Sequence, residues 1–116
     1  MQETCVRYMC LVYAAEDFGP SPDQVREFVT FRQEALDAGV YLEAGQLRPA
    51  ETSTTLRSNG GEVMLTDGPF AEIKEQLGGF VLLECRDLDE ALTWARRIPG
   101  LRDGGVEVRP MVEFPR

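Results

Sequence analysis

The chain has 116 residues, of which 43% are hydrophobic and 28% are charged, and its formal net charge is -8. This length predicts one domain, residues 1–116, that can bury a single hydrophobic core. The acidic balance argues against a nucleic-acid partner, because phosphate contacts need clustered lysine and arginine. No apolar run approaches the ~20 residues that span a bilayer, and the first residues lack the basic start and apolar stretch of a signal peptide. We therefore predict a cytoplasmic protein with no membrane partner.

The chain contains three cysteines and no histidine. An odd number of cysteines without a secretory signal argues against a disulfide framework, so we expect Cys5, Cys10 and Cys85 to be packing residues. The lack of histidine excludes Ser/His and Cys/His nucleophile pairs and the usual zinc sites. The sequence thus predicts neither a metal site nor a cofactor.

The first part of the chain predicts a strand, a helix and a second strand. Residues 5–13 are rich in β-branched, aromatic and aliphatic side chains, and both faces of this strand are largely apolar. Ser21 is placed to cap a helix, Gln24 reaches back to it as in a capping box, and Gly39 ends the helix. Residues 40–47 form the next predicted strand.

The middle of the chain predicts a β-hairpin. Residues 53–57 and 62–66 are predicted strands, joined through Asn59-Gly60. This dipeptide is a strong hairpin signal, because the turn needs positive φ at its central positions.

The stretch TDGPFAEIKEQLGGF follows the hairpin and predicts a short helix. The helix is expected to start at Asp67 or Gly68 and to end at Gly78. Helical spacing then directs three apolar side chains into the core, those of Phe70, Ile73 and Leu77.

The last part of the chain predicts a strand, a helix and a final strand. Residues 80–84 form a strand with two apolar faces, and Asp87 caps a helix that ends at Pro99-Gly100. Residues 106–112 form the last strand.

This order predicts an α+β fold: a ferredoxin-like βαββαβ unit with an inserted β-hairpin. Its two helices can cover only one face of an antiparallel sheet, whereas two of the predicted strands are apolar on both faces. We therefore predict a homodimer in which two sheets pack face to face.

A family resemblance follows from four segments, LRPAETSTTLR, TDGPFAEIKEQLGGF, DLDEALTWARRIP and EVRP. Together they resemble the DGPF branch of the YCII-related family, over residues 7–110. The resemblance implies a dimeric α+β barrel. Some members of this family carry a His/Asp pair that is proposed as catalytic, which this chain cannot reproduce without histidine.

The TDGPFAEIKEQLGGF stretch also suggests a functional site. A short connection needs neither the acid Asp67 nor the charged cluster Glu72, Lys74 and Glu75. On a helix, Glu72 and Glu75 share a face and can divide acid and base roles between them in a partly dry site. The alternative is that these side chains are a solvated charged surface.

Arg109 is a second candidate, because it shares a face of the last strand with Glu107. Its guanidinium can bind a ligand carboxylate, or it can pair within the protein with Asp67 or Glu107. Arg57 is a weaker candidate of the same kind.

The leading hypothesis is a homodimer with a pocket for a small polar or anionic metabolite near the dimer interface. Its predicted lining is Asp67, Arg109, Arg57 and the segment that carries Glu72, Lys74 and Glu75, and Asp67 is the candidate base for cofactor-independent acid–base chemistry. The alternative is a protein-interaction module linked to transcription control, because some members of the resembling family are associated with sigma factors of the extracytoplasmic type.

Overall fold

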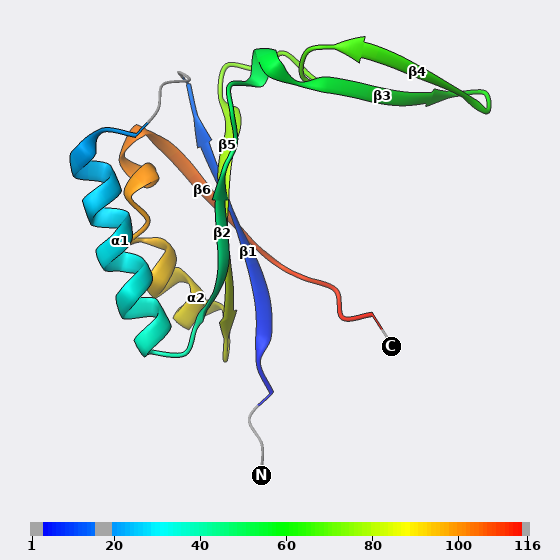
Figure 1. Cartoon of the computed structure of the whole chain (residues 1–116). Coiled ribbons are helices and arrows are strands. Elements are labelled where there is room, and N and C mark those ends of the chain that lie inside the picture. Colours follow the sequence, from blue (N-terminus) through cyan, green and yellow to red (C-terminus); the bar gives the residue numbers. More distant parts are fainter. Residues whose placement is uncertain (1–3, 16–19, 115–116) are drawn as a thin grey trace.

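The computed structural model of the chain describes residues 4–15 and 20–114. Its elements in chain order are β1 (Val6–Ala14), α1 (Pro22–Asp37), β2 (Tyr41–Gln46), η1 (Ala50–Thr52), β3 (Thr54–Asn59), β4 (Glu62–Asp67), β5 (Gln76–Cys85), α2 (Leu88–Ala95), η2 (Pro99–Asp103) and β6 (Gly104–Pro110). Four antiparallel strands form a sheet in the order β2-β5-β1-β6, and β3 and β4 form a separate two-stranded sheet. Both α-helices lie on one face of the large sheet (Figure 1), which confirms the predicted α+β, ferredoxin-like fold. Among the described residues, no helix has the length and apolar character needed to cross a membrane.

Local capping chemistry fixes both helix starts. The Ser21 hydroxyl accepts a hydrogen bond from the Gln24 amide at 3.1 Å, and the Gln24 side chain accepts one from the Ser21 amide at 3.0 Å. The carboxylate of Asp87 accepts from the Glu90 amide at 2.9 Å at the start of α2. Both caps were predicted, because these side chains satisfy backbone groups that the first helical turn leaves unpaired.

The hydrophobic core lies between the helices and the sheet. Its most deeply buried large side chains are Phe31, Leu83, Cys10 and Cys85. The prediction that cysteines are packing residues is therefore confirmed for Cys10 and Cys85, whereas Cys5 is exposed.

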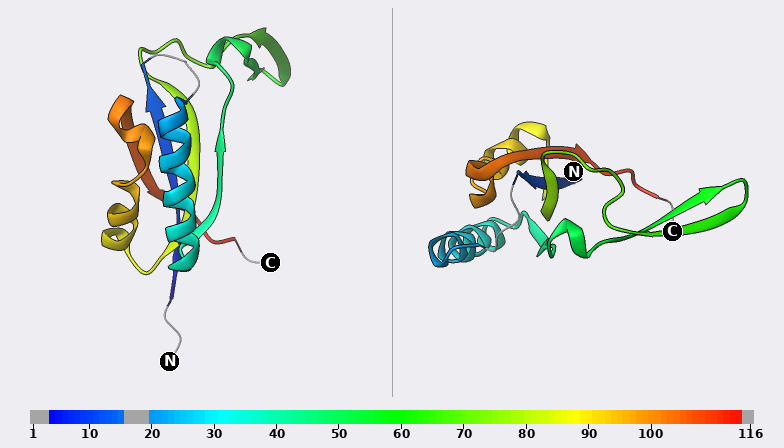
Figure 2. Two further views of the ribbon diagram at one scale, coloured as in Figure 1. Left: turned by 60° about the vertical axis from the view of Figure 1, so that its left-hand side comes forward. Right: turned by 90° about the horizontal axis from the view of Figure 1, so that it is seen from above.

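The sheet face that points away from the helices, called the open face below, has an apolar centre. Met9 and Leu11 of β1 and Phe80 and Leu82 of β5 alternate with core residues along their strands and are half-buried. The predicted two-sided character of these strands is thus confirmed. No described element of the chain packs over this face (Figure 2).

The β3–β4 hairpin, called the arm below, projects from the end of the sheet on the side opposite the helices (Figures 1 and 2). Its turn is Gly60-Gly61, with φ values of 60° and 92°. Only glycine adopts this backbone geometry without strain. The predicted hairpin is confirmed, but its turn lies one residue later than the predicted Asn59-Gly60, because Asn59 pairs with Glu62 as the last residue of β3.

The predicted helix after the hairpin is wrong. The segment before β5 consists of bends, and Gly68 has a left-handed φ of 108°. Phe70 and Ile73, which were expected in the core, are 65% and 57% exposed, and Leu77 lies in β5 and is 38% exposed. The physical reason is tertiary, because the residues from Gln76 onward pair with the sheet as β5. The remaining segment is too short to form a stable helix.

Two further boundaries differ from the prediction. The second helix ends at Ala95, and a 3-10 turn, η2, takes up the residues around Pro99-Gly100. The last strand covers Gly104–Pro110, two residues earlier than predicted. The strand shift is within the one or two residues by which element ends vary. The helix ends earlier because Ile98, which precedes Pro99, has an extended backbone.

Candidate functional site

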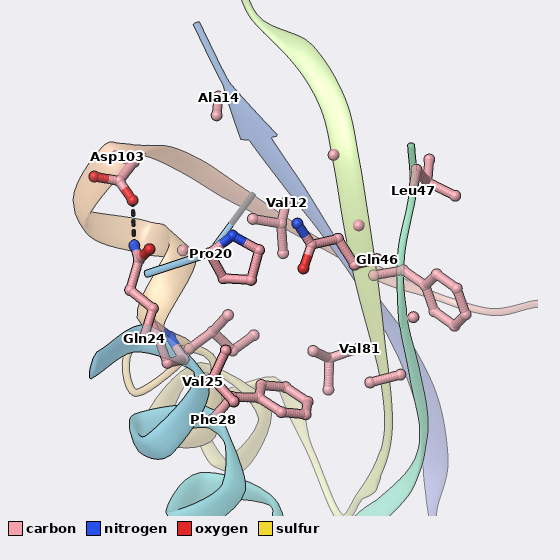
Figure 3. Close-up of a pocket in the computed structure, with 18 of the residues that line it drawn as sticks. Val12, Ala14, Pro20, Gln24, Val25, Phe28, Gln46, Leu47, Val81 and Asp103 are labelled. Atoms are coloured by element: carbon pink, nitrogen blue, oxygen red, sulfur yellow. Dashed lines mark hydrogen bonds between the residues drawn. The ribbon is translucent and has the colours of Figure 1, made fainter. Parts of the chain in front are cut away.

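A cavity of about 450 Å³ lies under the first turns of α1, where β1 and β2 end and β5 begins. Val25 and Phe28 point from α1 toward Val12 and Val81 of the sheet (Figure 3). The volume is within the range of small-molecule sites, which hold ligands in mostly apolar clefts.

Small residues on the strands leave this space unfilled. A Cβ atom on Gly79 of β5 would lie 2.8 Å from the carbonyl oxygen of Gly45, and one on Gly45 would lie 2.7 Å from the Phe80 ring. The Gly79 contact is with backbone, so this position requires glycine, whereas the Gly45 contact is with the end of the Phe80 side chain on the open face. Ala14 and Ala44 also line the cavity and add only a methyl group each. The floor of the cavity is therefore largely backbone.

The helix above the cavity contributes apolar side chains that remain accessible. Val25 and Val29 of α1 are 47% and 48% exposed, although both belong to the apolar stripe of the helix. Phe31 and Ala35, which lie on a different face of the helix, are 2% and 0% exposed. The helix therefore buries the face of Phe31 and Ala35, while the face of Val25 and Val29 borders the cavity and stays accessible, as does Leu36, which is 48% exposed.

A few polar groups surround the apolar lining. The side-chain amide of Gln24 donates a hydrogen bond to the Asp103 carboxylate at 2.6 Å, which links the start of α1 to η2. Gln46, Gln76 and Arg32 also line the cavity. The Gln46 side chain points into it (Figure 3). This is the composition of a site that holds an apolar body and orients it through a small number of hydrogen bonds.

Most of the site residues predicted from sequence gather at the base of the arm, away from this cavity. Asp67 pairs with Thr54 at the end of β4. Arg57 donates to the Phe70 carbonyl at 2.6 Å and lies over its ring at 4.1 Å from the centroid. The cluster Glu72, Lys74 and Glu75 is exposed in the segment before β5.

The predicted relation between Glu72 and Glu75 depended on a helix that is not formed there. Their shared helical face is therefore wrong as a geometric argument. Whether these residues act on a ligand stays a prediction, and the same holds for Asp67 and Arg57.

Arg109 lies on the open face and pairs with Glu107 at 2.8 Å. This carboxylate raises the pKa of the Arg109 guanidinium, through a hydrogen bond and through its charge. Of the two partners that the sequence left open, the structure gives Glu107. Arg109 and the residues at the base of the arm do not line the cavity under α1.

The sequence interpretation missed the residues around the cavity. Val25, Val29 and Gly79 are not among the site residues predicted from the sequence. A signal was present, because Gly78-Gly79 opens a strand whose later residues are large and apolar. Glycine at the start of such a strand indicates either close approach or empty space above it.

The comparisons with known proteins agree with the fold. The sequence matches the YCII-related domain family over residues 6–115. It is also 40% identical, over 92 residues, to an uncharacterised protein of Rhizobium meliloti (strain 1021). That alignment covers 78% of this chain and 74% of the relative.

Proposed function

The chain belongs to the YCII-related domain family, and we propose that it is a cytoplasmic homodimer that binds a small metabolite in the cavity under α1. The observation that carries this proposal is the cavity itself: about 450 Å³ of mostly apolar space held open by glycine and alanine. Clefts of this size with mostly apolar walls and a few polar groups are the usual form of small-molecule sites.

The lining selects an amphipathic ligand. The apolar side chains above and the backbone floor below suit a hydrocarbon or aromatic body. Gln46 and Gln76 can each donate and accept hydrogen bonds, and Arg32 supplies a positive charge at the cavity. A polar or anionic group at one end of the ligand is therefore the expected handle, consistent with a small carboxylate or phosphate ester.

Dimerisation is proposed from the open face. Met9, Leu11, Phe80 and Leu82 form an apolar centre on a sheet whose helices occupy the other side. Contiguous, partly accessible apolar surface that no described element covers is typical of an interaction site, and a two-fold partner buries the same patch on both subunits. The DGPF branch of the family is part of the same proposal.

The predicted acid–base chemistry belongs to this proposal as its catalytic part. Asp67 is the proposed base, and Arg109 would complete the site from the open face. The residues near Asp67 in sequence or in space are Arg57, Glu72, Lys74 and Glu75. In one subunit Arg109 is paired with Glu107, so this site depends on the second copy. Substitution of Asp67→Asn tests it: unchanged ligand hits in a thermal-shift screen would count against a role for Asp67.

The cavity is tested by a thermal-shift screen with small aromatic and aliphatic carboxylates. Ala44→Phe fills the cavity, and Ala38→Phe adds the same ring at an exposed position outside it. We expect hits on the wild type and on Ala38→Phe that raise the melting temperature by several degrees, because a ligand that binds only the folded state stabilises it. The same hits should be lost in Ala44→Phe. Hits that persist in Ala44→Phe would contradict the assignment.

A second candidate function is a protein-interaction module linked to transcription control through sigma factors of the extracytoplasmic type. The observation that favours it is the net charge of -8, which suits a basic partner protein. A pulldown at low and high salt separates the candidates, because salt screens a charge-driven complex. Capture that is insensitive to salt would count against this alternative.

A further inference from the structure

The arm carries an exposed apolar strip. Leu56 lies opposite Leu65 in the hairpin register, and Val63 follows on the same face toward the tip. Their exposed fractions are 64%, 67% and 70%. Burial of such side chains is the usual source of strand stability, so a strip exposed to this degree requires an explanation.

The other face of the arm is already engaged by its own chain. Arg57, which alternates with Leu56, holds the Phe70 ring and carbonyl. The Thr55 hydroxyl donates to the Gly68 carbonyl at 2.7 Å. These contacts fix the base of the arm and leave the apolar strip facing outward.

An arm of this kind is marginal by itself. A two-stranded hairpin without a third strand or a helix against it has little stability in water. The Cα radius of gyration is 16.3 Å, whereas a compact domain of this length has about 13 Å. The shape is therefore that of a subunit with a projection, which suits an element that gains its packing from another molecule.

The arm and the open face meet at one end of the sheet. The arm leaves the end of the sheet on the side away from the helices, so it overhangs the region in front of the open face (Figures 1 and 2). A molecule that packs on the apolar centre of that face would also meet the arm.

The charges of the open face fit a second copy of this chain. Across the sheet, Glu43 of β2 lies beside Leu82, Leu82 beside Met9, and Met9 beside Arg109 of β6. A two-fold axis along the strands places β6 of one copy over β2 of the other. Glu43 then faces Arg109, and Leu82 faces Met9, so the row complements itself.

We infer that each arm lies against the second copy and buries the strip of Leu56, Val63 and Leu65 there. The inference rests on the proposed dimer. A strand of six residues extends about 20 Å at ~3.3 Å per residue, and facing sheets lie about 10 Å apart. The arm is thus long enough to pass the partner's sheet, so its distal half lies along the partner's flank.

Sedimentation equilibrium tests the inference with two leucine substitutions. Leu56→Asp places a charge in the strip, and Leu88→Asp is the matched control on the helix side, where Leu88 is 47% exposed and an acid suits the first turn of α2. Each dimer contains the substitution twice. Loss of two buried leucines should raise the dissociation constant at least ~100-fold for Leu56→Asp. Leu88→Asp should dimerise like the wild type.

The outcomes distinguish failure of the arm contact from failure of the proposed dimer. A monomeric wild type would overturn both the dimer and the arm contact, while the cavity under α1 keeps its own test. A wild-type dimer with an equally tight Leu56→Asp dimer would overturn the arm contact alone, including the case in which another protein covers the strip.

Hydrogen exchange on the wild type gives a second test that needs no substitution. The amides of β3 and β4 should exchange at least ~10-fold more slowly at concentrations where the dimer forms, because an isolated hairpin opens easily. Exchange in the arm that does not change with protein concentration, in a protein that does dimerise, would overturn the inference.

Discussion

Phe28 and Phe31 lie one turn apart on α1, with ring centroids 5.8 Å apart, yet they border different environments. Phe31 is 2% exposed and meets Trp94 edge-on at 6.2 Å, at the closed end of the layer between helices and sheet. Phe28 lines the cavity at the other end. The difference shows that one amphipathic helix can pack into the core with some of its side chains and line a cavity with others.

The sheet accounts for this difference. At the closed end β5 presents Leu83 and Cys85, whereas near its start the same strand carries Gly78-Gly79. The helix stripe itself is apolar throughout. Whether a side chain is core or cavity wall is therefore decided by the strand opposite it.

Truncation of the two phenylalanines should give the largest contrast. We expect Phe31→Ala to lower the free energy of unfolding by about 3–5 kcal/mol, because it leaves a cavity in a closed core. Phe28→Ala should cost about 1–2 kcal/mol, because one side of its ring already faces open space. Urea unfolding measures both values. Equal losses would show that the cavity end is packed in solution.

Enlargement of two alanines tests the same contrast in the opposite direction. Ala91 is 0% exposed at the closed end, and Ala44 lines the cavity. Ala91→Leu should cost about 1–3 kcal/mol through overpacking. Ala44→Leu should change the free energy of unfolding by less than about 0.5 kcal/mol, as substitutions in uncrowded places do. A large loss for Ala44→Leu would contradict an empty cavity.

The closed end should also give the protein a characteristic response to alkaline pH. Burial raises the pKa of Cys10 to about 11 and that of Cys85 to about 12, from an ordinary value of 9.0. As the pH rises through the ordinary value, the unfolded chain loses thiol protons that the folded chain retains. The free energy of unfolding should therefore fall between about pH 9 and pH 12.

Urea unfolding at pH 8 and pH 10.5 measures this loss. The control is the double variant Cys10→Val, Cys85→Val, in which the thiol contribution is absent and the remaining fall should be smaller. A fall of equal size in both proteins would assign it to other groups. At pH 8, exposed Cys5 should react rapidly with a thiol reagent while the two buried thiols remain protected.

The smallest expected effect concerns the surface contact that joins the two helices at the closed end. Arg97 pairs with Glu34 at 3.0 Å and lies over the Trp94 ring at 4.9 Å from its centroid. Both contacts are partly solvated, so Arg97→Ala should cost about 1 kcal/mol or less. A loss above about 2 kcal/mol in urea unfolding would mean that this contact is more deeply desolvated than its exposure indicates.

Local chemistry in the sequence predicted most elements of the fold. The Ser21 and Asp87 caps and the Gly60-Gly61 turn are determined by neighbouring residues, and the two-sided pattern of β1 follows from alternation. The helix predicted from Asp67 or Gly68 is not formed, although its apolar residues have helical spacing. Residues from Gln76 onward pair with β1 instead and form the start of β5.

The candidate site could be predicted only in part. Charged residues such as Asp67 and Arg109 are visible in a sequence, and their placement at the arm and on the open face follows from their strands. The cavity under α1 depends on how far a helix stands from a glycine floor, for which the sequence gives only the indirect sign of Gly78-Gly79. No residue type in a sequence indicates a cavity directly.

The proposed ligand of the cavity under α1 has an apolar body and an anionic group. A direct test is a map of amide chemical shifts on addition of 8-anilinonaphthalene-1-sulfonate, a probe with both features. Binding in the cavity should give saturable changes at the first turns of α1, around Gly45 and around Gly79. Changes confined to Met9 and Leu11 of the open face and to Leu56 of the arm, with those around the cavity unmoved, would contradict it.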